Sequence, residues 1–149
     1  DPAETAIRAV LGQQVSVAAA RTAAGRLARH GHFPRPEQIA ALDEATLQMP
    51  RRRAATVIEL GRRLAAGEVR LDPGTDWDEA ERQLLAIPGV GPWTAKYIRM
   101  RALGDPDVSL PTDLGIVRGT AARGLDPDDQ RWKPWRSYAM HYLWNLGED

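Results

Sequence analysis

The feature that most constrains this chain of 149 residues is a glycine-rich corner between two helical patterns. The stretch LLAIPGVGPWTAKYI covers residues 84–98 and places Pro88, Gly89 and Gly91 between two apolar, helix-forming runs. Glycine tolerates positive φ and lets another backbone approach closely, because it has no Cβ. Pro92 suits the first turn of the second helix. Leu84, Ile87, Val90 and Ala95 have the spacing to pack two helices around the turn, so the sequence predicts a tight helical hairpin.

Helical periodicity extends over nearly the whole chain. Apolar residues recur at spacings of three and four in AIRAVLGQQVSVAAARTAAGRLARHG, with an interruption at residues 12–14, a cap at Ser16 and an end at Gly31. Asp76 and Glu79 form a capping-box variant. No segment shows an alternation worth assigning to a strand. Helices or turns are predicted over 36–42, 43–49, 51–66, 77–87, 92–103, 113–124, 126–130 and 134–146, which gives an all-α orthogonal bundle.

Composition narrows the possible functions. The chain contains no cysteine, which excludes disulfides, thiolate zinc sites and cysteine-ligated iron–sulfur clusters. Net charge is zero, so charge alone does not indicate nucleic acid, and the basic run 51–53 fits a solvated helix start as well as a contact. His30, His32 and His141 do not form a convincing metal set. Because no segment is long and apolar enough to span a bilayer, we expect a cytoplasmic protein.

The corner has the chemistry of a phosphate cradle. Amides at the start of the helix over 92–103 should point outward with the positive end of the helix dipole. Carbonyl oxygens of the turn are candidate ligands for Na⁺ or K⁺ bridging to the phosphate. The alternative is a hairpin whose glycines only make a sharp corner. The candidate phosphate-binding positions are Gly89, Val90, Gly91 and Thr94, and the candidate cation ligands are the carbonyls of Leu85, Ile87 and Val90.

Four segments together resemble one family. LLAIPGVGPWTAKYI, DVSLPTDLGI, WKPWRSYAMHYLW and AIRAVLGQQVSVAAA are similar to the helix-hairpin-helix DNA glycosylases, above all to the 3-methyladenine DNA glycosylase II (AlkA) type. The resemblance implies a two-lobed catalytic core over residues 1–149, with the family's small N-terminal domain absent. It also implies a bacterial monomer that acts on alkylated bases in double-stranded DNA, with nucleoid-associated activity and no required cofactor.

The resemblance places the catalytic carboxylate at Asp113. Without it, an Asp at this place is more often a helix cap. We expect Thr112 to cap the helix and Asp113 to face the cleft. An ionised acid stabilises the oxocarbenium character of a sugar that loses its base, and the same acid can serve as general base on the attacking water. Both roles stay open.

The helix after the corner indicates the reaction type and the pocket. Bifunctional relatives carry a nucleophilic lysine where this chain has Trp93, and Lys96 lies nearly a turn further on, so the resemblance implies a monofunctional enzyme that leaves an abasic site. An aromatic slot suits a cationic alkylated purine, because cation–π attraction is worth about 0.5–2 kcal/mol. The expected pocket residues are Trp93, Tyr97, Trp144 and Leu114, the last in place of a tyrosine, whereas Trp132, Trp135 and Tyr138 are expected in the core.

An enzyme that acts on a base inside a duplex must extrude it and fill the gap. Gln14 stands where the family uses a leucine wedge, and Gln13 is a second candidate for the same gap. The rival reading of the whole chain is a non-catalytic helix-hairpin-helix DNA-binding module. That reading explains the corner but gives no reason for Asp113, Trp93 and Trp144 to occur together.

Overall fold

The computed structural model describes residues 1–28 and 32–146, and within them the chain is helical without a strand. The predicted all-α class is therefore confirmed. None of the helices in the described part is long and apolar enough to cross a membrane. The helices are α1 (Pro2–Leu11), α2 (Val17–Leu27), α3 (Pro36–Ala40), α4 (Arg51–Ala65), α5 (Trp77–Leu85), α6 (Pro92–Ala102), α7 (Leu114–Ala121) and α8 (Arg136–Leu146), with 3₁₀ turns η1 (Glu44–Leu47) and η2 (Gln130–Trp132).

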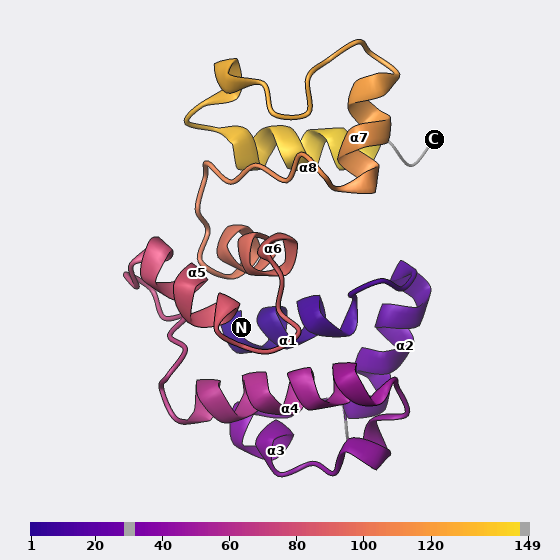
Figure 1. The fold of residues 1–149 in the computed structure, drawn as a ribbon, viewed down its shortest axis with the longest axis vertical. Coiled ribbons are helices and arrows are strands. Elements are labelled where there is room, and N and C mark those ends of the chain that lie inside the picture. The colour runs from indigo at the N-terminus through magenta and orange to yellow at the C-terminus, as the bar shows by residue number, and fades with distance from the viewer. Residues whose placement is uncertain (29–31, 147–149) are drawn as a thin grey trace.

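The helices form two lobes that share α6 (Figure 1). In the large lobe, α1 to α5 pack with α6 around an aliphatic core that includes Ile7, Leu60 and Leu84. In the small lobe, α7 and α8 pack on the other side of α6 around a shorter set of buried residues. That set is Met100, Val108, Leu110, Ile116, Met140 and Leu143.

Several helix boundaries follow the local sequence signals. The Oγ of Ser16 accepts from the amide of Ala19 and caps α2, and the carboxylate of Asp76 accepts from the amide of Glu79 and caps α5. Pro92 begins α6, as expected of a first-turn proline. Each signal is local, because a cap or a ring constraint acts within one turn of the chain.

Other expectations need correction. The stretch 43–49 forms only a 3₁₀ turn, α7 ends at Ala121 instead of near Gly124, and α8 begins two residues after Pro134. Gly31, the expected end of the second helix, lies outside the described residues, and α2 itself ends at Leu27. The core assignment of Trp135 and Tyr138 is wrong. Trp135 is 58% and Tyr138 64% exposed, because the small lobe covers only one face of α8. Of the three aromatics expected in the core, only Trp132 packs against it.

Polar side chains hold the segment between α6 and α7. The Nε of Arg99 donates to Asp105 Oδ2 (2.5 Å), and its Nη1 donates to Glu81 of α5 (2.8 Å). Arg136 at the start of α8 pairs with both carboxylate oxygens of Asp107 (2.7 and 2.9 Å), and its guanidinium holds the pKa of that carboxyl below the usual range. These contacts fix the path of the chain into α7 and so help to set the place of Asp113.

Candidate active site

The corner between α5 and α6 is a tight turn that packs against α4. Gly89 has φ +92°, in the region that favours glycine, and a Cβ at this position would lie 2.1 Å from Thr56 Oγ1. The hydroxyl of Thr56 donates to the Pro88 carbonyl oxygen (2.9 Å). Leu84, Ile87 and Val90 are buried, as the spacing predicted. The turn is therefore fixed from behind by a buried hydroxyl and by apolar packing.

The start of α6 presents unused amide groups. Gly91 is its N-cap residue and offers no side chain to cap the helix. Within the described chain, the amides of Gly91, Trp93 and Thr94 donate no hydrogen bond. Such amides, at the positive end of an eleven-residue helix, form the kind of group that binds a phosphate.

Carbonyl oxygens of the turn fall into two sets. Those of Pro88 and Gly89 accept from Thr56 and from Gln13. By contrast, the Ile87 carbonyl accepts from the Val90 amide (3.0 Å), a bond that leaves a lone pair on its oxygen. The Leu85 and Val90 carbonyls take no further bond from the described residues. The three expected cation ligands therefore all keep lone pairs that no described donor occupies. No cluster of three or more His, Cys, Asp or Glu side chains suited to a metal occurs in the described chain, and His30 lies outside it.

Asp113, not Thr112, caps α7. Its Oδ1 accepts from the amides of Gly115 (2.9 Å) and Ile116 (3.1 Å). The expectation that Thr112 would be the cap is wrong, because a carboxylate offers about four acceptor positions and can cap a helix while facing another group. Asp113 forms no ion pair with any described residue and is half-buried.

Two indole rings bracket this carboxylate from different elements. Trp144 of α8 donates from Nε1 to Asp113 Oδ1 (2.7 Å), and Trp93 of α6 donates from Nε1 to Oδ2 (3.1 Å). Gly115 lets Trp144 approach, since a Cβ there would lie 2.8 Å from the indole Cδ1. Helices α6 and α8 therefore both orient the acid, and Oδ2, with one acceptor bond, is the oxygen with more capacity left for another group.

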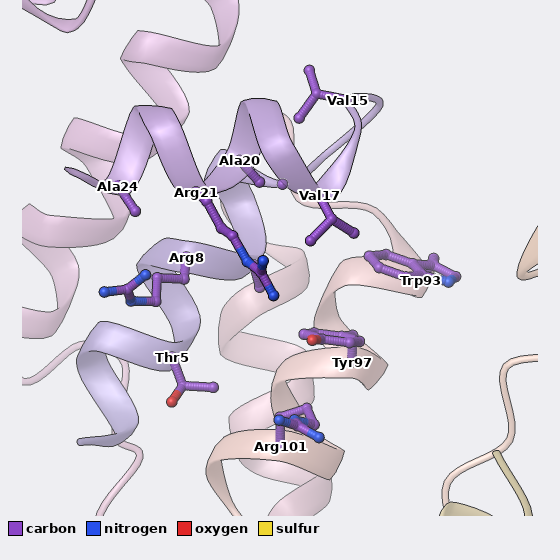
Figure 2. A pocket seen from close by; sticks show the side chains of 12 residues that line it. Thr5, Arg8, Val15, Val17, Ala20, Arg21, Ala24, Trp93, Tyr97 and Arg101 are labelled. Atoms are coloured by element: carbon purple, nitrogen blue, oxygen red, sulfur yellow. The ribbon is translucent and has the colours of Figure 1, made fainter. Parts of the chain in front are cut away.

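Trp93 and Tyr97 form one wall of a hollow of about 380 Å³ between α1, α2 and α6 (Figure 2). Their rings stack with centroids 5.1 Å apart, and Tyr97 also meets Trp144 at 6.0 Å. Figure 2 shows Arg21 reaching from α2 into the space between the three helices. The structure thus joins the predicted aromatics, and Trp144, which does not line the hollow, contacts both Tyr97 and Asp113.

Two predicted site residues lie apart from this wall. Leu114 is 69% exposed and does not line the hollow. Gln14 is exposed in the loop between α1 and α2 with φ 55°, whereas Gln13 beside it is half-buried and hydrogen-bonded to the corner. Lys96 lines a separate hollow with Arg99 and Arg136 and does not line the one that Trp93 and Tyr97 form.

Sequence reasoning missed several residues of the site. Arg8, Arg21 and Arg101 line the hollow, and none of the described residues that line it is acidic. Arg101 also lies 3.4 Å from His141, whose pKa is lowered by burial and by that neighbouring guanidinium. Thr56 was missed as well, although a lone hydroxyl in the buried face of α4 was a signal that it has a polar partner.

Comparisons with known proteins show the family of this chain. Residues 7–140 match the model of the HhH-GPD superfamily of base excision DNA repair proteins. The probable bifunctional transcriptional activator/DNA repair enzyme AlkA of Mycobacterium tuberculosis is 46% identical over 99% of the chain and 34% of its own length. DNA-3-methyladenine glycosylase 2 of Escherichia coli is 35% identical over 97% of the chain and 57% of its own length. The chain therefore spans less than two thirds of these relatives.

Solved structures share the fold. The crystal structure of a DNA-3-methyladenine glycosidase from Bacillus halodurans superposes with a TM-score of 0.80 at 24% identity, covering 99% of this chain and 76% of that one. Schizosaccharomyces pombe 3-methyladenine DNA glycosylase in complex with abasic DNA gives a TM-score of 0.76 at 24% identity, over 99% and 81%. With its corner, its carboxylate and the match over residues 7–140, the chain belongs to the HhH-GPD superfamily of base excision DNA repair proteins.

Proposed function

We propose that this chain is the catalytic core of a monofunctional DNA glycosylase that hydrolyses the N-glycosidic bond of alkylated purines in duplex DNA. The product is an abasic site, and the reaction needs no cofactor. The expected partner is double-stranded DNA, bound by a monomer. One observation carries the proposal: a half-buried carboxylate, Asp113, is oriented by an indole from each side and lies beside the helix that begins at the corner.

Asp113 is the residue assigned to chemistry. A sugar that loses its base develops positive charge, and a fixed carboxylate stabilises that charge without reorganising at the moment of reaction. Oδ1 accepts from two amides and one indole, so Oδ2 is the oxygen assigned to face the sugar. The same oxygen could instead take a proton from the attacking water. Neutralising the charge removes either contribution.

The unused amides at the start of α6 are assigned to a backbone phosphate. Gly91, Trp93 and Thr94 supply them, while Gly89 and Val90 shape the turn in front. A monovalent cation at the carbonyls of Leu85, Ile87 and Val90 would add positive charge beside the same phosphate. Because phosphate contacts release counterions, binding should weaken as salt rises, and a salt-independent affinity would count against this grip.

The remaining site residues are assigned to the wedge that fills the duplex and to the slot that holds the flipped base. Gln14 is exposed and is assigned to the gap that the extruded nucleotide leaves. Trp93 and Tyr97 are assigned to the flipped base, with Trp144 behind them. Leu114 is exposed beside Asp113, where it can contact a substrate bound at that carboxylate.

Two features of the hollow pull substrate preference in opposite directions. Aromatic faces favour a cationic base such as one methylated at N3 or N7. Arg21 and Arg101 on the same hollow favour a neutral base, whereas the charge of Arg8 is paired with Glu4 (2.7 Å). We assign alkylated purines because the relatives are named for 3-methyladenine. Release of 3-methyladenine measured against release of hypoxanthine, a neutral base, would show which contact dominates.

The absence of strand cleavage is part of the proposal. Trp93 occupies the place of the lysine of bifunctional relatives, and an indole cannot form a Schiff base. Lys96 is in another hollow, so it is not placed to attack the sugar. Products that contain intact abasic strands, cut only by later alkali treatment, are expected.

Base release from methylated duplex DNA tests the proposal. Asp113→Asn keeps an oxygen that can cap α7, so folding and duplex binding should be retained while release falls about 100-fold or more. Asp126→Asn makes the same charge change at an exposed position of the small lobe and is the matched control. Equal, near-zero release by the wild-type protein and by Asp113→Asn, with binding intact, would instead favour a non-catalytic DNA-binding module.

A further inference from the structure

The side chain of Gln13 joins two parts of the proposed DNA-binding face that lie far apart in the sequence. Its Nε2 donates to Thr94 Oγ1 (2.8 Å) in the first turn of α6 and to the Gly89 carbonyl oxygen (3.2 Å) in the corner. These acceptors are 81 and 76 residues away along the chain. One carboxamide therefore spans the α1–α2 loop and the phosphate cradle.

Both protons of the Gln13 amide are used in these bonds, and the side chain is half-buried. A wedge must leave the protein surface and enter the gap in a duplex. Gln13 could do so only by breaking both bonds and leaving the hydroxyl of buried Thr94 without this donor. Its neighbour Gln14 is exposed, and its side chain makes no hydrogen bond with a described residue, so the two glutamines have different roles.

Gln14 is held in a conformation that a free loop would not keep. Its φ of 55° lies in the left-handed region, which is uncommon for a residue other than glycine and persists when the surroundings over-determine it. On one side Gln13 is fixed to the corner, and on the other Ser16 caps α2. The left-handed residue therefore lies between two anchored neighbours.

We propose that Gln13 is a positioning residue that tethers the wedge loop to the corner, and that Gln14 alone enters the duplex. This rests on the proposed function. The phosphate held at α6 and the gap filled by Gln14 belong to the same duplex, so the distance between them sets which nucleotide is extruded. The tether fixes that distance through Thr94 and Gly89, while the phosphate grip itself does not depend on it.

The test measures duplex affinity and base extrusion separately. The probe is a duplex with 2-aminopurine at the target position, whose fluorescence rises when the base leaves the stack, and affinity comes from the anisotropy of an end label. Gln13→Met keeps the size of the side chain but removes both donors. It should lower the extruded fraction about tenfold with affinity within about twofold of wild type. Gln130→Met, an exposed change of the same kind, is the control and should alter neither.

Thr94→Val separates a tether from a wedge. It removes the acceptor and keeps the α6 amide that is assigned to the phosphate. A tether predicts that extrusion falls in Thr94→Val, and that Gln13→Met combined with Thr94→Val is no worse than Gln13→Met alone. If Gln13 were the wedge, Thr94→Val would leave extrusion unchanged. Thr22→Val is the control for the same change on an exposed helix, and thermal unfolding confirms that each variant is folded.

The outcomes distinguish the tether from the function on which it rests. If the wild-type protein extrudes the base and Gln13→Met or Thr94→Val extrudes it equally well, the tether is wrong and the proposed function stands. Failure of the wild-type protein to bind the duplex or to extrude the base overturns both the tether and the proposed glycosylase. Loss of affinity in Gln13→Met, in parallel with the loss of extrusion, also contradicts the tether, because it would make Gln13 part of the phosphate grip.

Discussion

The two lobes use their large side chains differently. In the large lobe, aliphatic residues fill the core, and the groups assigned to DNA lie on its surface at the corner and in the α1–α2 loop. In the small lobe, the aliphatic core is short, and Trp93, Tyr97 and Trp144 pack against it while two of them also hold Asp113. Stability and function therefore depend on the same side chains in the small lobe, whereas in the large lobe they meet only at the corner.

We expect the strongest effect from a substitution of Trp144, because this residue belongs both to the small-lobe core and to the site. Trp144→Ala removes an aromatic ring from the small-lobe core and a donor from Asp113, so it should lower the free energy of unfolding by about 3 kcal/mol as well as slow base release. Trp135→Ala, at the exposed residue just before α8, should stay within about 0.5 kcal/mol. Urea denaturation measures both. A loss of unfolding free energy in Trp144→Ala as small as that in Trp135→Ala would show that the small lobe does not depend on its site aromatics.

The corner offers the matching test in the large lobe. Gly89→Ala places a methyl group on Thr56 at φ +92°, so we expect a loss of about 2–4 kcal/mol and weaker duplex binding. Gly91→Ala has φ −93° and open space around the added methyl, so its unfolding free energy should change by less than about 1 kcal/mol. A comparable loss in both variants would mean that the turn is not shaped by Thr56.

Charge beside the corner should influence binding without affecting stability. Arg52 lines a hollow with Pro88 and Gly89, and it forms no ion pair with a described residue, whereas Arg51 pairs with Glu44 (3.1 Å). Arg52→Ala should reduce the slope of log affinity against log salt by about 1 if it meets a phosphate. Arg51→Ala should change the slope less. Identical slopes for wild type and Arg52→Ala would remove α4 from the interface.

The smallest effect is a pH dependence in the small lobe. The pKa of His141 is lowered by burial and by Arg101, so the folded state favours the neutral ring. Stability from this group is therefore present above the unfolded value of 6.5 and is lost as pH falls from there through the folded pKa. His141→Asn should flatten the stability profile in that range. An unchanged profile would place the dependence elsewhere.

Local signals in the sequence predicted much of the fold. Ser16, Asp76 and Pro92 each mark a helix start because a cap or a ring acts within one turn, and the corner follows from glycines between apolar helix faces. Family resemblance, not physics, singled out Asp113. Its role as the cap of α7 was missed because Thr112 was assumed to fill it, although one carboxylate can serve both tasks.

The contacts that remained hidden are those between helices. Nothing in a single helical pattern says which face of α2 meets α6, so Arg21 was not placed in the hollow with Tyr97. The same limit applies to Gln13, whose partners lie 76 and 81 residues away. Trp135 was expected in the core because it is aromatic. The sequence does not show how much of α8 the small lobe covers.

The assignment of Asp113 to the sugar is tested with two duplexes, one normal and one in which a cationic pyrrolidine replaces the target sugar. The pyrrolidine mimics the charge that develops as the base leaves, and a site built for that charge binds it at least about 100-fold more tightly than the normal duplex. We predict this preference for the wild-type protein and its loss in Asp113→Asn, with equal affinity of both proteins for the normal duplex. A preference that survives in Asp113→Asn would contradict the assignment of this carboxylate to the sugar.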